Sequence, residues 1–196
     1  MRDRVQSYFD TLAKLLVQTE VSDRTARSIS IGEGFEWVRD AAHRAHDSGN
    51  KIMFIGNGGS AGIASHLAVD YSKNGNMRSL AFSDPSFLTC LGNDMGFENV
   101  FAKQIEFHGR AGDLLVAISS SGKSANINKG VSQARACGCE VVTFSGFGDD
   151  NPLRTTGYIN FYVRSPEYGF VEVAHLSLCH AILDLDMGWG QTKRQA

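Results

Sequence analysis

The sequence predicts an α/β protein, a three-layer α/β/α sandwich with a central parallel sheet. Short apolar runs alternate along the chain with longer segments of helical periodicity. These runs are apolar on both faces, which is typical of strands that helices cover on both sides of a sheet. The chain has 196 residues, of which 42% are apolar, enough for one full core. We therefore expect a single domain over 1–196, with N-terminal helices over 1–48 and the α/β core over 49–196.

The first 48 residues contain two helical patterns. Val5, Tyr8, Leu12 and Leu16 recur at helical spacing and predict a helix over 5–17. A second helix is expected over 34–47, before a break at 48–50. Because the first helix precedes the first strand, we expect it to pack outside the main core, against a second subunit.

Segment 51–71 predicts a buried strand, a tight turn and the start of a helix. The strand is expected over 52–55, the turn is Gly56-Asn57-Gly58-Gly59, and the helix restarts at Ser60. Such a turn directs backbone N–H groups and the positive end of the helix dipole at one spot, where a phosphate is the natural occupant. Ser60 either caps the helix or donates its hydroxyl to that anion.

The same helix carries His66 and Asp70, four residues apart and therefore on one face. An imidazole and a carboxylate after a phosphate-binding turn indicate a reactive site. Taken alone, His66 on this Ala/Leu-rich helix is more typical of a hydrogen-bonded core histidine.

The remaining elements follow in the order of an α/β fold. Strands are expected over 79–82, 114–118, 140–144 and 159–163. Helices are expected to start near Pro85 and to cover 97–109, 124–136 and 171–187. Since ligands of such sheets bind beyond the carboxyl ends of the strands, Ser60 and the serines after residue 118 should share one crevice.

Residues 113–126 repeat the strand–turn–helix logic with a second polar turn. Ser119, Ser120, Ser121 and Ser124 offer hydroxyl donors next to a helix start, a combination that binds a phosphate monoester without a strong cation. In isolation the segment is more typical of a serine-rich turn with Ser124 as an N-cap. Its pairing with the first turn favours phosphate binding.

Two better-known phosphate motifs fit less well. The Gly-Lys-Ser triplet at 122–124 resembles a P-loop, but Ala117 stands where that motif needs its first glycine. Gly56, Gly58 and Ala61 match a permissive dinucleotide fingerprint, with Asp84 as a candidate ribose ligand. A dinucleotide site has no use for a second serine-rich turn.

Charge and hydropathy argue against two classes of partner. The net charge is −2, which gives no reason to expect nucleic acid or an anionic membrane. No apolar run approaches the ~18 residues of a membrane span, and the N-terminus lacks a signal-peptide pattern. We expect a cytoplasmic protein.

The motifs GNGGS at 56–60, GND at 92–94 and AISSSGKSANI at 117–127 resemble the sugar isomerase (SIS) domain, and specifically the phosphoheptose isomerases. The resemblance implies a flavodoxin-like sheet and conversion of sedoheptulose 7-phosphate to D-glycero-D-manno-heptose 7-phosphate for surface-glycan biosynthesis. It also implies a homotetramer with active sites at subunit interfaces and, in several members, a zinc ion.

The resemblance assigns roles to individual residues. Substrate-binding positions correspond to Asn57, Gly58, Ser60, Asp94, Ser119, Ser120, Ser121, Ser124 and Glu172. Metal positions correspond to His66, Asp70, Glu172 and His180, and the candidate acid and base are Asp70 and His180. Along one helix, Glu172 and His180 are ~12 Å apart in rise, so either different subunits supply them or Glu172 lies outside the inner ligand set. His175 is rotated ~140° from His180 and is expected to be structural.

Two of these positions depart from the family pattern. The family usually has Glu where this chain has Asp70, and Gln where it has Glu172. The shorter Asp withdraws a base by about an ångström, which can cost ~100-fold in rate. Two histidines and two carboxylates nevertheless suit Zn²⁺ or another transition metal.

Two alternatives from other classes remain open at this point. One is a non-catalytic SIS tetramer that serves as a protein-binding scaffold, of the replication-initiator-binding type. The other is a sugar-phosphate sensor, although the sequence has no recognisable DNA-binding module. Retention of His66 and His180 favours the enzyme.

Overall fold

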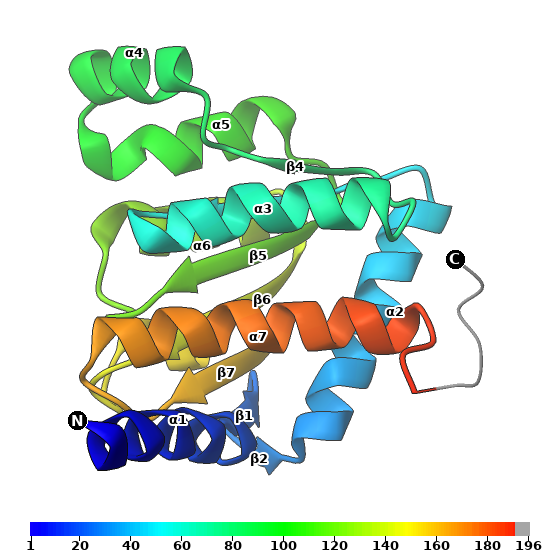
Figure 1. The fold of residues 1–196 in the computed structure, drawn as a ribbon. Helices are drawn as coiled ribbons and strands as arrows, with labels where there is room; N and C mark the ends of the chain where they lie inside the picture. The colour runs from blue at the N-terminus through cyan, green and yellow to red at the C-terminus, as the bar shows by residue number, and fades with distance from the viewer. Residues whose placement is uncertain (191–196) are drawn as a thin grey trace.

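The chain is built around a seven-stranded sheet in the order β2-β1-β7-β6-β5-β3-β4 (Figure 1). A computed structural model describes residues 1–190. The strands are β1 (Glu20–Asp23), β2 (Ser28–Ile29), β3 (Ile52–Gly56), β4 (Ser79–Ala81), β5 (Leu114–Ser119), β6 (Glu140–Gly146) and β7 (Ile159–Val163). From β4 to β7 all neighbours pair in parallel, which confirms the predicted sheet.

Two short strands on one side of the sheet were absent from the sequence prediction. β1 pairs antiparallel with β7, and β2 pairs antiparallel with β1. The expectation of helices alone before residue 49 was therefore wrong. The reason is physical: β1 reads Glu-Val-Ser-Asp and buries only Val21, so it lacks the apolar run that marks the inner strands.

Helices cover both faces of the sheet. They are α1 (Arg2–Val17), α2 (Ile31–Asp47), α3 (Gly59–Lys73), α4 (Pro85–Met95), α5 (Val100–His108), α6 (Ala125–Ala136) and α7 (Tyr168–Asp186), with short 3-10 turns over Phe97–Asn99 and Pro152–Thr155. Helices α2, α3 and α7 pack on the face formed by Ile52 and Phe54. Helices α5 and α6 pack on the opposite face, formed by Met53 and Ile55. Strand β3 is thus buried on both sides, as its uninterrupted apolar run predicts.

Local capping fixes where two of these helices begin. The Ser30 hydroxyl accepts from Glu33 N (3.2 Å), and the Glu33 carboxylate accepts from Ser30 N (2.7 Å). This capping box starts α2 at Ile31, one turn before the predicted start. Asp84 caps α4 by accepting from Ser86 N and Phe87 N, with Pro85 in the first turn, as expected from the sequence.

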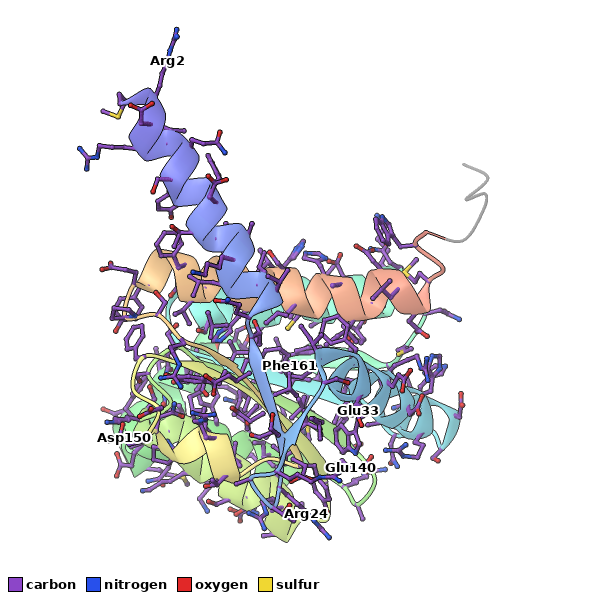
Figure 2. All side chains as sticks on the ribbon, turned by 90° about the horizontal axis from the view of Figure 1, so that it is seen from below. Arg2, Arg24, Glu33, Glu140, Asp150 and Phe161 are labelled. Carbon is purple, nitrogen blue, oxygen red and sulfur yellow. The ribbon has the colours of Figure 1, made fainter. Side chains whose placement is uncertain are left out.

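Helix α1 lies outside the main core. All its residues are at least partly exposed, and it extends beyond the other elements with Arg2 near its tip (Figure 2). It meets the rest of the chain along α7, where the rings of Tyr8 and Phe170 are 4.5 Å apart between centroids. Val5 and Phe9 remain exposed. None of the helices in the described part of the chain is both long and apolar enough to cross a membrane.

Candidate active site

The two serine-containing turns line one cavity of about 240 Å³ at the carboxyl edge of the sheet. Their strands, β3 and β5, are adjacent and parallel, and Gly56 pairs with Ile118. Because parallel neighbours end at the same edge, the turns that follow them face each other. The described residues that line the cavity are Asn57, Gly58, Gly59, Ser60, Ser119, Ser120, Ser121, Ser124, Tyr168 and Glu172.

In the first turn, the main chain at the end of β3 lies very close to the main chain at the start of α3. A Cβ on Gly56 would overlap the main chain of Ser60, so only glycine fits where β3 passes under the start of α3. Gly58 has φ of +54° and is the N-cap of α3. Ser60 is therefore not the cap. It is the second residue of the helix, 3% exposed, and lines the cavity.

The side chains of Asn57 and Asn126 join the two turns. Asn57 Nδ2 donates to Asn126 Oδ1 (2.8 Å), and Asn126 Nδ2 donates to Asn57 Oδ1 (2.9 Å). Asn126 also accepts from Ile127 N through the same oxygen. Sequence reasoning missed Asn126, because an asparagine in a first helical turn carries no distinctive signal. Asn57 was expected to hold a sugar hydroxyl. In the structure its side-chain amide already donates one hydrogen bond to Asn126 and accepts one from it.

The second turn presents hydroxyl groups that are not fully satisfied. Ser119 Oγ donates to Ser124 Oγ (3.4 Å), and Lys123 N donates to Ser121 Oγ (3.2 Å). Ser124 is the N-cap of α6, but its side chain makes no capping bond. Ser120 Oγ is buried and finds no hydrogen-bond partner among residues 1–190. A buried hydroxyl without a partner is costly, and a ligand in the cavity would offset that cost.

The electrostatics of the cavity are unusual for a phosphate site. Of the described lining residues, none is a lysine or arginine, and Glu172 is the one acidic residue. Lys123 points away to the exposed Asp150, with 3.1 Å between Nζ and Oδ1. An anion here would rely on hydroxyl groups, main-chain N–H groups and the N-terminal ends of α3 and α6.

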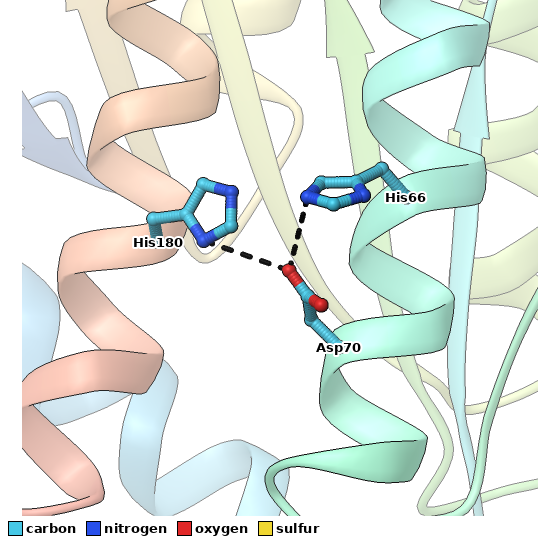
Figure 3. A group of neighbouring side chains, drawn as sticks. All are labelled: His66, Asp70 and His180. Carbon is cyan, nitrogen blue, oxygen red and sulfur yellow. Dashed lines mark ion pairs between the residues drawn. The ribbon is translucent and has the colours of Figure 1, made fainter.

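His66, Asp70 and His180 form a second group on the seam between α3 and α7 (Figure 3). Oδ2 of Asp70 lies 3.1 Å from Nε2 of His66 and 3.6 Å from Nδ1 of His180. The two imidazole rings are 5.1 Å apart between centroids. The Asp70 side chain is 14% exposed and that of His66 is 53% exposed, so the group is open to solvent on one side.

Asn74 orients Asp70 from the next turn of α3. Its Nδ2 donates to Asp70 Oδ1 (3.2 Å), which leaves Oδ2 for the two histidines. Sequence reasoning missed this residue, since only the assembled helix end shows the contact. Aspartate in place of the longer glutamate thus still reaches both imidazoles.

The three side chains suit a divalent metal. One ligand atom from each lies within 4.8 Å of the others. Ligand atoms at about 2.0–2.1 Å from a tetrahedral zinc ion are about 3.4 Å apart, close to the two Asp70 contacts. Two histidines and one carboxylate are the protein ligands of one class of catalytic zinc sites.

Two predicted site residues lie elsewhere in the protomer. Glu172 lies beside Gly59 at the cavity and outside the described metal-type group. The expectation that it completes this group is not met within one protomer, because eight residues of α7 separate it from His180 by ~12 Å of rise. Asp94 lies within α4, exposed, and accepts from Asn93 Nδ2 (2.8 Å) instead of lining the cavity.

His175 has the structural environment that was expected. It is fully buried, and its Nε2 lies 3.0 Å from Ser145 O, so Nε2–H is the donor. Burial lowers the pKa of His175 to about 4, although the Ser145 carbonyl acts in the opposite direction. A neutral buried imidazole away from the cavity is no candidate for proton transfer.

The cavity and the metal-type group lie along one helix. Ser60 and His66 are both on α3, six residues and about 9 Å of rise apart. Glu172 and His180 follow the same direction along α7, which runs beside α3 (Figure 1). The cavity and the His66, Asp70 and His180 group are therefore successive features of the α3–α7 seam.

Comparison with known proteins agrees with this geometry. The family model of the SIS domain matches residues 8–146. The chain is 33% identical to the phosphoheptose isomerase of Proteus mirabilis over 178 residues, which cover 85% of this chain and 91% of that protein. It is 34% identical to the phosphoheptose isomerase of Photorhabdus laumondii over 177 residues, which cover 85% and 90%.

Solved structures give the same result. The phosphoheptose isomerase of Neisseria gonorrhoeae superposes with a TM-score of 0.80 at 30% identity, covering 94% of this chain and 98% of that one. The phosphoheptose isomerase of Francisella tularensis superposes with a TM-score of 0.79 at 25% identity, covering 93% of this chain and 96% of that one. The chain belongs to the SIS-domain family and, within it, to the phosphoheptose isomerases.

Proposed function

We propose that the protein is an aldose–ketose isomerase that converts sedoheptulose 7-phosphate to D-glycero-D-manno-heptose 7-phosphate for the synthesis of heptose-containing surface glycans. One observation carries the proposal: a hydroxyl-lined cavity and a His–Asp–His group lie one after the other along α3. The relatives of known name, which are phosphoheptose isomerases, support the same substrate class.

In this proposal the cavity holds the phosphate. Ser60, Ser119, Ser121 and Ser124 donate hydroxyl hydrogen bonds, and the unpartnered Ser120 hydroxyl is a further candidate donor. Gly58 contributes main chain at the start of α3. Glu172, at the inner wall beside Gly59, is positioned for a sugar hydroxyl, which can donate to a carboxylate. Asp94 retains a substrate role only if its helix reaches a neighbouring subunit's cavity.

Proton transfer then falls to Asp70 and His180. One of them removes the proton from the carbon next to the carbonyl, which gives an enediol. The other handles the proton on oxygen or on the neighbouring carbon. Without a bound metal, His180 is the stronger candidate for the base, because Oδ2 of Asp70 is already shared between two imidazoles and Oδ1 accepts from Asn74. An imidazole nitrogen that binds a metal is not free to accept a proton, so the two roles of His180 exclude each other at one nitrogen.

We further propose that His66, Asp70 and His180 hold Zn²⁺. A bound divalent cation would polarise the substrate carbonyl and favour negative charge on its oxygen. Glu172 is a ligand only in an assembly that brings it to this group from another protomer.

We also propose that the protein works as a homotetramer with active sites between subunits. The exposed apolar side chains of α1, among them Val5, Tyr8 and Phe9, support this, since a projecting helix with such a face is typical of an oligomer contact.

The test is to incubate purified protein with sedoheptulose 7-phosphate, with and without a chelator, and to follow the aldose product. We expect product, and loss of turnover when the metal is removed. A folded, tetrameric protein that gives no product with any divalent metal would contradict the proposal and favour a protein-binding scaffold or a sugar-phosphate sensor.

A further inference from the structure

A second cavity, of about 250 Å³, lies at the opposite edge of the sheet. Its walls come from the segment after α2, the start of β4, the end of α5 and the segment before β5. Strand β3 separates it from the serine-lined cavity, and five residues of strand span about 17 Å. The two cavities are therefore distinct sites, and one sugar phosphate cannot reach both.

The second cavity is lined by basic side chains, whereas the described lining of the first cavity has none. Lys51, Arg78 and Arg110 line the second cavity, together with His108. The buried Asp113 balances one of these charges, because Lys51 Nζ donates to Asp113 Oδ2 (2.6 Å). Two further donors, Lys51 N and Arg110 N, complete the hydrogen bonding of that carboxylate. Two guanidinium charges remain uncompensated by it.

Both arginines have guanidinium N–H groups that are available to a ligand, and hydrogen bonds hold both residues in place. Arg78 gives one bond to Gly49 O, which leaves most of the five N–H groups of its guanidinium. The main chain of Arg110 is fixed at both ends, since its N–H donates to Asp113 and its carbonyl accepts from the Cys139 thiol. No side-chain partner of the Arg110 guanidinium is found among residues 1–190. Two guanidinium groups that line one cavity are suited to bind phosphate oxygens.

An aromatic wall adds a second recognition element. Phe107 is 54% exposed and lines the same cavity. His108 beside it is held by Phe82 and Phe87, with ring centroids 6.1 and 5.9 Å away. An exposed ring next to phosphate-binding cations offers a stacking surface for a flat base.

From this arrangement we infer that the second cavity binds a nucleotide, with its phosphate on Arg78 and Arg110 and its base against Phe107. The inference concerns a site separate from the proposed isomerase centre. Nucleotide binding at the second cavity can be tested without reference to isomerase activity.

The test is calorimetric titration of the full chain with AMP and with inorganic phosphate. We expect AMP to bind about tenfold more tightly than phosphate, because base stacking adds to the phosphate contacts. Phe107→Ala should reduce AMP binding to the level of phosphate. Arg78→Ala combined with Arg110→Ala should weaken both ligands by more than about tenfold.

Matched variants distinguish the two cavities. Arg24→Ala, a surface arginine on the β1–β2 side of the sheet, should leave AMP binding unchanged. Lys51 is left intact, since its loss would strand the buried Asp113 carboxylate and unfold the protein. Absence of AMP binding, or AMP binding that survives the double arginine variant and disappears in Ser121→Ala, would overturn the inference.

Discussion

Asn57 and Asn126 hold each other through two reciprocal amide hydrogen bonds of 2.8 and 2.9 Å. They are 69 residues apart in the sequence. Asn57 lies in the turn after β3, and Asn126 lies in the first turn of α6, directly after the serine-rich turn. The pair therefore fixes the spacing between the two walls of the cavity before a ligand arrives. Such preorganisation lowers the cost of binding, because the turns need no ordering when the phosphate enters.

Removing this pair should weaken binding more than chemistry. We expect Asn126→Ala to raise KM for the sugar phosphate about tenfold with little change in kcat, since loss of the two neutral bonds is worth roughly 1–3 kcal/mol. The check is a double-mutant cycle of Asn57→Ala and Asn126→Ala on KM. Effects that simply add would show that the two amides act separately.

Glu172 should oppose the phosphate. It is the one acidic residue among the described cavity walls, and no lysine or arginine there offsets it. Glu172→Gln should tighten the binding of inorganic phosphate to chelator-treated protein about threefold to tenfold at low ionic strength. Titration calorimetry measures this, with Glu167→Gln, at the N-cap of α7, as the matched control. Weaker phosphate binding in Glu172→Gln would mean that the carboxylate helps to hold the anion.

The His–Asp–His group should couple metal binding to stability. If Zn²⁺ binds these three side chains, a concentration about 100 times its Kd should raise the free energy of unfolding by about 2.7 kcal/mol. His66→Ala should abolish most of this increase in a thermal melt. The control, His108→Ala, removes a surface histidine outside the group and should retain the increase. Equal stabilisation of all three proteins would place the ion elsewhere.

The buried His175 should make the fold sensitive to mild acid. Burial lowers its pKa to about 4 in the folded state, below the ordinary value near 6.5. The unfolded chain therefore takes up the proton first, and stability falls as pH drops from about 6.5 to 4, by about 3 kcal/mol from this residue. Above pH 6.5 the residue contributes no pH dependence.

Urea unfolding at a series of pH values measures this effect. His175→Gln keeps an N–H donor for Ser145 O and removes the titrating group, so its stability should change less than the wild type between pH 6.5 and 4. Parallel curves for the two proteins would show that another group causes the acid sensitivity.

The inner sheet and both phosphate-type turns were predictable, because their signals are local. The apolar run of β3, the glycines after it and the serines after β5 each mark one element, and parallel topology brings them together. Strands β1 and β2 were not predictable. They have four and two residues of mostly polar sequence, and they take their structure from the pairing of β1 with β7 and of β2 with β1. The same holds for the Asn126 contact, which exists only after two distant turns have met.

Part of the candidate site was predictable for the same reason. His66 and Asp70 share a helix face by spacing alone. The family resemblance assigned His180 to the same group, and in the structure it comes from the adjacent α7. Glu172 was expected at both the cavity and the metal, yet helix rise allows it only one of these places in a protomer. Asp94 was expected to bind substrate because it belongs to the GND motif. In the structure it lies in α4 and does not line the cavity.

Binding of sedoheptulose 7-phosphate to two variants shows whether the phosphate anchor and the reactive group are separate. The proposed site consists of an anchor, represented by Ser121, and a reactive group, represented by His180. Titration calorimetry should find that His180→Ala binds the substrate within about threefold of wild type and forms no aldose. Ser121→Ala should bind at least about tenfold more weakly, because it loses a hydrogen bond to a charged phosphate. If His180→Ala loses binding while Ser121→Ala retains it, the anchor and the reactive group have been assigned to the wrong residues.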